Sequence, residues 1–109
     1  MFECVIYIHL PLAKEPAIQI ARYEFDPGLQ LGEQVKIVNL KWGWEDSESF
    51  SIEAIVKSRR YEIRPQEKPQ NDIFRLLVGL EMIDKELQQR AIAILEKLNP
   101  EEINRYIIL

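Results

Sequence analysis

The sequence contains a single cysteine, a single histidine and no long hydrophobic run, and each shortage excludes a class of protein. One thiol, Cys4, cannot form an intrachain disulfide, which fits a reducing compartment and makes the cytoplasm the expected location. With His9 as the only imidazole, a transition-metal site would need carboxylates for its other ligands, and no spacing of residues indicates one. No stretch approaches about 18 apolar residues, so no membrane-spanning helix is expected.

Basic residues are also too few to favour a nucleic-acid or membrane surface as the main partner. The chain has 14 Lys and Arg against 18 Asp and Glu, and its formal net charge is −4. Non-specific nucleic-acid binding and attraction to anionic membranes both need an excess of positive charge. The first ten residues have no basic region, and Glu3 and His9 interrupt their apolar pattern, so no secretory signal is expected. Phosphate-binding loops, dinucleotide fingerprints and internal repeats are absent from the sequence, and we predict no cofactor.

The first part of the chain has the alternating apolar residues that are typical of short strands. The predicted strands are residues 2–10, 17–25, 34–42, 50–57 and 61–64. The second strand changes parity between Ile20 and Tyr23, which predicts a bulge near Ala21 and Arg22, or a strand covered on both faces. A turn at residues 26–28 (Asp-Pro-Gly) separates the second strand from the third, and a turn at residues 58–60 (Ser-Arg-Arg) separates the fourth from the fifth. The third and fourth strands are expected to form a hairpin.

Turn signals between strands of this length favour a small antiparallel barrel or a strongly bent sheet. The segment Leu31-Gly32-Glu33-Gln34-Val35-Lys36-Ile37 has a glycine at the corner followed by alternating apolar residues. In this it resembles the way in which SH3-like barrels open a strand. The resemblance covers these few residues and implies a small SH3-like barrel as one form of the sheet.

Residues 72–98 form the longest apolar region, and we predict that they are helical. Leu87, Ala91, Ile94 and Leu98 recur at spacings of three and four, which places them on one helix face. Residues 73–83 are apolar at nearly every position, so a helix there would be buried on more than one side. Gly79 weakens the pattern and Asp84 is a candidate cap, which leaves one kinked helix and two helices as alternatives. The sequence Asn-Pro-Glu-Glu at 99–102 predicts the start of a last short helix over residues 100–107.

These elements together predict an α+β fold. An N-terminal four- to five-stranded antiparallel sheet or small SH3-like barrel, residues 1–64, is followed by a linker at 65–70. Two or three C-terminal helices, residues 71–109, then pack on the sheet to make one compact domain. Strands that precede helices without alternation argue against a doubly wound parallel sheet.

Residues with chemical potential have non-catalytic interpretations that fit their positions better. Cys4 lies on the apolar face of the first strand, where cysteine acts as a small buried hydrophobe. His9 is at the end of that strand with no partner in reach for acid–base work. The acidic loop residues Glu45, Asp46 and Glu48 lack the pattern of a calcium loop, so we predict no metal site. An enzyme would have to use carboxylates such as those of Glu53 or Glu62 inside a pocket, and this is the least favoured function.

Two groups of residues are candidate binding sites. Trp42 and Trp44 have the same parity, so they close the end of the barrel if they point inward and form an anchoring platform if they point outward. The only basic cluster holds an aromatic residue within it, as single-stranded nucleic acid would require. Its members are Lys57, Arg59, Arg60, Tyr61 and Arg64. A solvated turn that keeps the sheet edge soluble is the alternative for this cluster.

The favoured function is a non-catalytic protein-interaction or oligomerisation module. The predicted helical region carries more apolar surface than one small sheet covers, and exposed apolar surface marks an interface. A homodimer through residues 73–83 or 107–109 is the simplest form, with another protein as the other possible partner. The candidate contact residues are Trp42, Trp44, Ile73, Phe74, Leu77, Ile107 and Leu109. A nucleic-acid-binding module that uses the basic cluster is the alternative.

Overall fold

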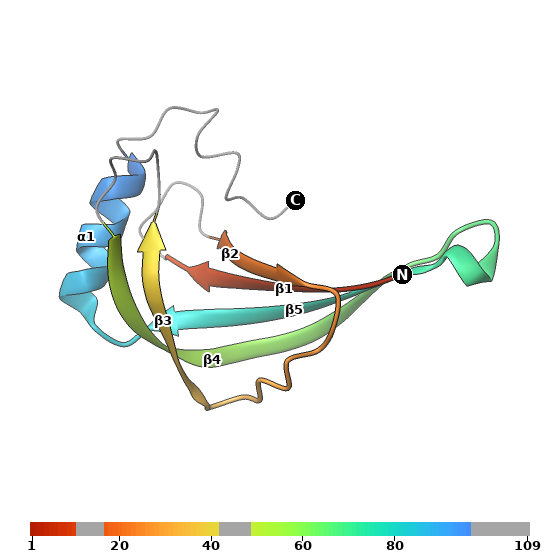
Figure 1. The fold of residues 1–109 in the computed structure, drawn as a ribbon, viewed down its shortest axis with the longest axis horizontal. Helices are drawn as coiled ribbons and strands as arrows, with labels where there is room; N and C mark the ends of the chain where they lie inside the picture. Colours follow the sequence, from red (N-terminus) through yellow and green to blue (C-terminus); the bar gives the residue numbers. More distant parts are fainter. Residues whose placement is uncertain (11–16, 42–48, 97–109) are drawn as a thin grey trace.

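The described part of the chain is built around one curled five-stranded sheet (Figure 1). The computed structural model describes residues 1–10, 17–41 and 49–96. Its elements in chain order are β1 (Phe2–His9), β2 (Ala17–Tyr23), β3 (Gln34–Lys41), β4 (Ser49–Arg64), the 3-10 helix η1 (Pro69–Asn71), β5 (Ile73–Met82) and α1 (Lys85–Glu96). None of the helices in these ranges has the length and apolar character needed to cross a membrane.

The strand order is β2-β1-β5-β4-β3, which places β5 at the centre of the sheet. β5 runs parallel to β1, whereas the three other pairs of neighbours are antiparallel. We call the face that carries the hydrophobic core the inner face and the opposite one the outer face. Residues 24–33 join the edge strands β2 and β3, and they lie against the inner face, where Arg59 Nη1 donates a hydrogen bond to the carbonyl of Leu29.

The prediction of helix over residues 72–84 is wrong, and with it the prediction of two or three C-terminal helices. Ile73–Met82 is the central strand β5, and the sheet is mixed rather than wholly antiparallel. Its apolar pattern is nearly continuous because both of its faces are covered: Leu76 and Val78 lie in the core on the inner face, and Leu77 is buried on the outer face. A strand buried on both sides has no alternation in its sequence, so its pattern can be mistaken for that of a helix buried all round.

Helix α1 begins where the sequence places a cap. Asp84 Oδ1 accepts hydrogen bonds from the backbone N–H groups of Glu86 and Leu87, which is the usual geometry of a capping aspartate. Ala91 and Ile92 of α1 are buried in the core at one end of the sheet. The helix predicted over residues 100–107 lies outside the described residues.

The prediction of two separate strands at 50–57 and 61–64 is also wrong. Ser49–Arg64 is one long strand, β4, which pairs with β3 in its first half and with β5 from Ala54 onward. The residues expected to turn, Ser58 to Arg60, instead follow a shift of register between Val56 and Ser58. A bulge inserts one residue and bends the strand while pairing continues, so turn-like residues at this position do not reverse the chain.

Other strand predictions are confirmed. β1 places Cys4, Ile6 and Ile8 together in the core, as their alternation predicts. β3 and β4 form the expected hairpin. The irregularity predicted in the second strand is present at Ile20, which is skipped in the pairing of β1 with β2, one residue before the expected position.

The inner face is filled by apolar side chains from β1, β2, β4, β5 and α1. The buried cluster consists of Cys4, Ile6, Ile8, Leu10, Ile18, Ile52, Ala54, Val56, Leu76, Val78, Leu80, Met82, Ala91 and Ile92. This core occupies the part of the sheet nearest α1. At the other end β4 and β5 continue beyond β3 and are connected through η1, so that this end of the sheet projects from the molecule (Figure 1).

Candidate functional site

Exposed apolar side chains gather on the inner face of the projecting end. Main-chain pairing places Phe74 beside Ile63 on β4, and Leu76 beside Tyr61. Tyr23 of β2 pairs with Cys4 of β1, which in turn pairs with Leu76, so Tyr23 belongs to the same face. The ring of Phe25 lies 5.2 Å from that of Tyr23, centroid to centroid. We call this group the aromatic patch, and its members are Tyr23, Phe25, Tyr61, Ile63 and Phe74.

The aromatic patch continues the core into solvent. Its five residues are between 39% and 59% exposed, whereas their neighbours on the same face, Cys4 and Leu76, are fully buried. The alternation that fills the core near α1 therefore persists along β4 and β5 past the point where β3 ends. Exposed apolar side chains gathered on one face mark interaction sites more often than scattered single ones do.

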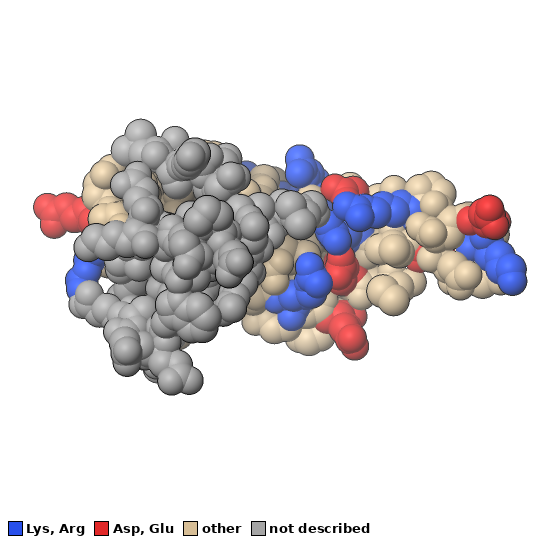
Figure 2. Space-filling model, turned by 90° about the horizontal axis from the view of Figure 1, so that it is seen from above, with Lys and Arg blue, Asp and Glu red and all other residues tan. Residues whose placement is uncertain are grey.

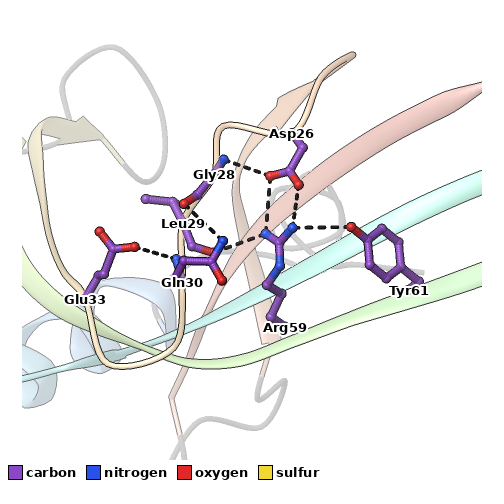
Figure 3. Close-up of polar contacts among 7 residues, drawn as sticks. All are labelled: Asp26, Gly28, Leu29, Gln30, Glu33, Arg59 and Tyr61. Atoms are coloured by element: carbon purple, nitrogen blue, oxygen red, sulfur yellow. Dashed lines mark hydrogen bonds and ion pairs between the residues drawn. The ribbon is translucent and has the colours of Figure 1, made fainter.

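An ion pair borders the aromatic patch and fixes the loop that carries Phe25. The guanidinium of Arg59, on the inner face of β4, makes two hydrogen bonds to the carboxylate of Asp26, one of them from Nη1 to Oδ1 at 3.2 Å (Figure 3). Arg59 Nη1 also reaches the carbonyl oxygen of Leu29 at 3.1 Å, and Nη2 lies 3.3 Å from the hydroxyl of Tyr61. Arg59 thus joins a loop residue 33 positions away to the edge of the patch.

Residues 26–28, for which the sequence predicts a turn, form no regular backbone turn but lie in the loop between β2 and β3 and supply the geometry for this pair. Gly28 has a φ of +81°, a backbone conformation that glycine adopts without strain. Its N–H donates to Asp26 Oδ1 at 2.8 Å, and the N–H of Gln30 donates to Glu33 Oε1 at 2.7 Å. The bond from Gly28 orients the Asp26 carboxylate toward Arg59, and the bond to Glu33 lies further along the same loop (Figure 3).

The hydrogen bonds from Arg59, followed by the one from the Gly28 N–H, lower the pKa of Asp26 below its ordinary value of 3.8. Each of these donors favours the charged form of the carboxylate. Because the pKa is lowered on folding, ionised Asp26 stabilises the folded state above about pH 4, and this contribution is lost as the pH falls through the folded-state pKa.

Asp26→Asn is therefore expected to reduce stability at neutral pH and to lose this effect in acid. At pH 7 the variant should have a lower Tm than the wild type, and the difference should shrink below about pH 4 as the wild-type carboxylate becomes protonated. The measurement is thermal unfolding by circular dichroism across pH 2 to 7. Glu24→Gln, which removes the same charge from an exposed neighbour, is the control, and identical pH profiles for the two variants would refute the role given to Asp26.

The predicted basic cluster is divided between the two faces of the sheet. Arg59 and Tyr61 lie on the inner face, whereas Arg60 and Arg64 lie on the outer face, opposite Leu77 and Ile73 of β5. Arg64 is paired with the carboxylate of Glu62 at 3.1 Å, and Arg59 with that of Asp26. Lys57 is exposed at the bulge. No single face therefore presents the basic cluster as a continuous positive surface.

The outer face carries an alternating network of charges instead. The carboxylate of Glu3 lies 2.6 Å from Arg75 and 3.7 Å from Arg22, and Arg75 lies 3.9 Å from Glu62. In Figure 2, basic and acidic side chains are interspersed along the coloured part of the surface. Such a surface has little of the one-sign field that attracts nucleic acid.

The other residues proposed from the sequence have diverse positions. Trp42, Trp44, Ile107 and Leu109 lie outside the described residues. Of the three from residues 73–77, Phe74 is in the aromatic patch, Ile73 is half-buried, and Leu77, at 3% exposure, is covered on the outer face. Sequence reasoning missed Tyr23, Phe25 and Ile63 as candidates. Strand parity was the available signal for Ile63, because it shares a face with Tyr61.

The residues considered for chemistry from the sequence have different environments in the described structure. Cys4 is fully buried, and burial raises the pKa of its thiol, which keeps it in the unreactive protonated form. His9 and Glu53 are exposed, and Glu62 belongs to the outer-face charge network. Within the described ranges no three His, Cys, Asp or Glu side chains are placed to share a metal ion.

Comparison with known proteins identifies no relative from which a function can be transferred. No protein-family model, no curated protein and no solved structure matches this chain. The aromatic patch and its surroundings are the features of this structure that bear on function.

Proposed function

We propose that this chain is a non-catalytic protein-interaction module that binds its partner through the aromatic patch. The observation that supports the proposal is the gathering of five exposed apolar side chains on one face, four on paired strands and Phe25 in the adjoining loop. Large aromatic side chains supply most of the binding energy at protein interfaces, because each removes a large apolar area from water.

The surroundings of the aromatic patch fit the same function. Its apolar centre is bordered by charged groups, Arg59 and Asp26, which is the arrangement of a protein interface with a polar rim. The side chain of Arg59 lies with its guanidinium carbon 5.8 Å from the centre of the Tyr61 ring, so that the ring is held in place from one side. A preordered aromatic group loses less conformational entropy on binding than a mobile one.

This basis replaces the one expected from the sequence. The apolar surplus was assigned to a helix at 73–83, but that segment is the central strand β5 and most of it is covered. The exposed apolar side chains of residues 73–83 lie near its two ends, Phe74 and Ile83, and of these Phe74 belongs to the aromatic patch. The cytoplasm remains the proposed location, because the free thiol of Cys4 is suited to a reducing compartment.

The test is affinity capture of the tagged protein from its own cells, with and without nuclease, using a patch variant and a matched control. Phe25→Ser combined with Ile63→Thr removes two exposed apolar side chains and keeps a β-branched residue in β4. The control is Val38→Thr, which makes the same kind of change on β3. Val38 is 60% exposed, and β3 is separated from β5 by β4.

We expect the wild type and Val38→Thr to retain the same protein partner after nuclease treatment. The patch variant should recover at least about 10-fold less of it, because losing interface aromatic and aliphatic anchors costs on the order of 2 kcal/mol. Equal recovery by the patch variant would contradict the proposal. Loss of the partner from the wild type on nuclease treatment would point instead to nucleic acid.

A further inference from the structure

At the projecting end of β4, no strand among the described residues pairs with the edge that faces away from β5. β3 pairs with β4 only as far as Ile55, opposite Gln34, and the last main-chain bonds on that side join Val56 to Gly32 and Glu33. From Ser58 to Arg64 the pairing of β4 with described residues is to β5 alone. About half of the N–H and C=O groups of such a strand point away from its one neighbour and are available to another strand.

The side chains along this edge alternate in a defined way. Ser58, Arg60, Glu62 and Arg64 lie on the outer face, opposite Gly79, Leu77, Arg75 and Ile73 of β5. The residues between them, Arg59, Tyr61 and Ile63, lie on the inner face. The outer row thus has its one acidic residue, Glu62, between two basic ones, Arg60 and Arg64.

We propose that the partner strand is β4 of a second copy of this chain, paired antiparallel along residues 58–64 about a two-fold axis at Tyr61. The inference rests on the proposed function and names its partner, because Tyr61 and Ile63 belong to the aromatic patch. It is carried by charge complementarity: in this register Arg60 of each copy lies directly opposite Glu62 of the other.

Symmetry leaves few registers to compare. Residues directly opposite each other in an antiparallel pair lie on the same face of the sheet. A two-fold axis perpendicular to the sheet therefore places one residue opposite its own copy, and not opposite the copy of its neighbour in the chain. An axis at Arg60 or at Glu62 places identical charges opposite each other, which is destabilising. An axis at Ile63 pairs Glu62 with Arg64 but runs into Pro65, which ends the strand. An axis at Tyr61 alone pairs unlike charges and uses all seven residues from 58 to 64.

The charged groups remain able to make the new contacts. Among the described residues no hydrogen bond or ion pair is formed by the exposed side chain of Arg60. Glu62 is already close to Arg64 and Arg75, but its side chain is 39% exposed and a carboxylate accepts several hydrogen bonds. On the inner face the same register places the two Tyr61 rings side by side and joins the two aromatic patches into one surface.

Sedimentation equilibrium of the purified full chain tests the dimer, with two charge reversals on the same row of side chains. Arg60→Glu places two pairs of like charges across the axis, and we expect a roughly 10- to 30-fold increase in the dimer Kd. Arg64→Glu makes the same change of charge at a position that faces Ser58 of the other copy, so its Kd should stay within about 3-fold of the wild type. Circular dichroism checks that both variants are folded.

A mixing experiment tests the register itself. Glu62→Lys alone is expected to weaken the homodimer as Arg60→Glu does, but a mixture of the two variants restores both unlike pairs. Native mass spectrometry of the mixture should then show the heterodimer in excess over either homodimer. If Glu62→Lys does not fold, the comparison of Arg60→Glu with Arg64→Glu still decides the register.

A wild-type protein that stays monomeric up to about 1 mM would overturn the inference, since a Kd above this value is too weak for a specific dimer. Equal effects of Arg60→Glu and Arg64→Glu, or no effect of either, would overturn the register and with it the proposed dimer. A monomer whose capture of another protein still depends on Phe25 and Ile63 would leave the proposed function standing with a different partner. A monomer that captures no other protein through Phe25 and Ile63 would contradict both the dimer and the proposed function.

Discussion

Replacing Leu80 with alanine is expected to lower the free energy of unfolding by about 3 to 4 kcal/mol. Leu80 is fully buried near the C-terminal end of β5, the central strand, directly between Ile8 of β1 and Val56 of β4, which are also buried. Alanine removes three carbon atoms and leaves a cavity that the paired strands on both sides cannot close without breaking their register. The cost therefore includes both the lost transfer free energy and the cavity.

Urea unfolding followed by far-ultraviolet circular dichroism measures this change, with Leu31→Ala as the matched control. Leu31 is 64% exposed in the loop before β3, so its truncation should change stability by no more than about 0.5 kcal/mol. An unchanged m-value would show that the Leu80 variant unfolds from the same compact state. If Leu80→Ala cost no more than Leu31→Ala, β5 would not be the centre of the core.

The identity of β5 shows why sequence patterns resolve some elements of this fold and not others. β1 was predictable, because Glu3 and His9 alternate with core residues and indicate a strand with one face that is more exposed to solvent. In β5 Leu76, Leu77 and Val78 are consecutive and all buried, so neither a period of two nor one of 3.6 is visible. The parallel pairing with β1, some seventy residues earlier, is what covers β5, and no local pattern encodes it.

The sequence around the bend in β4 also did not reveal the path of the chain. Ser58, Arg59 and Arg60 are polar and resemble a turn, but the strand continues through them because β5 pairs with each of the three. A bulge and a turn both interrupt alternation, and only the presence of a neighbouring strand separates them. The sequence therefore indicated the position of an irregularity correctly and its consequence for the chain direction wrongly.

The candidate site was predictable only in part for the same reason. Tyr61 and Phe74 were candidate residues, but as members of a basic cluster and of a helix, not as neighbours on one face. The link between Asp26 and Arg59 joins a loop to a strand 33 residues away, and it follows from the curl of the sheet rather than from either local sequence. Phe25 lies beside Tyr23 in the loop that this link joins to β4.

A second large effect is expected on the outer face, where Gly79→Val should lower the free energy of unfolding by about 2 to 3 kcal/mol. Gly79 lies between Tyr7 of β1 and Ser58 of β4 in the sheet. The ring of Tyr7 extends over Gly79, and its hydroxyl is 3.0 Å from Ser58 Oγ. A β-carbon at Gly79 would lie 2.6 Å from the Tyr7 hydroxyl oxygen and 2.7 Å from Cζ, and it would also meet Ser58 Oγ. Any side chain here must displace the ring.

Removing the Tyr7 ring should remove most of the destabilisation caused by Gly79→Val, so a double-mutant cycle is the decisive measurement. In a Tyr7→Ala background the space above Gly79 is open, so Gly79→Val should cost less than about 1 kcal/mol by urea unfolding, with valine's preference for strands acting in its favour. Tyr7→Ala alone removes the packing of the ring over Gly79 and its hydrogen bond to Ser58. The losses in free energy of unfolding of the two single variants should therefore add up to more than the loss of the double variant. Equal costs in the two backgrounds would mean that Gly79 is required by the backbone of β5 and not by the aromatic ring that crosses it. Unequal costs would instead establish that the ring of Tyr7 covers the space that Gly79 leaves on the outer face of the central strand. This cross-strand contact helps to fix the register of β1 on β5.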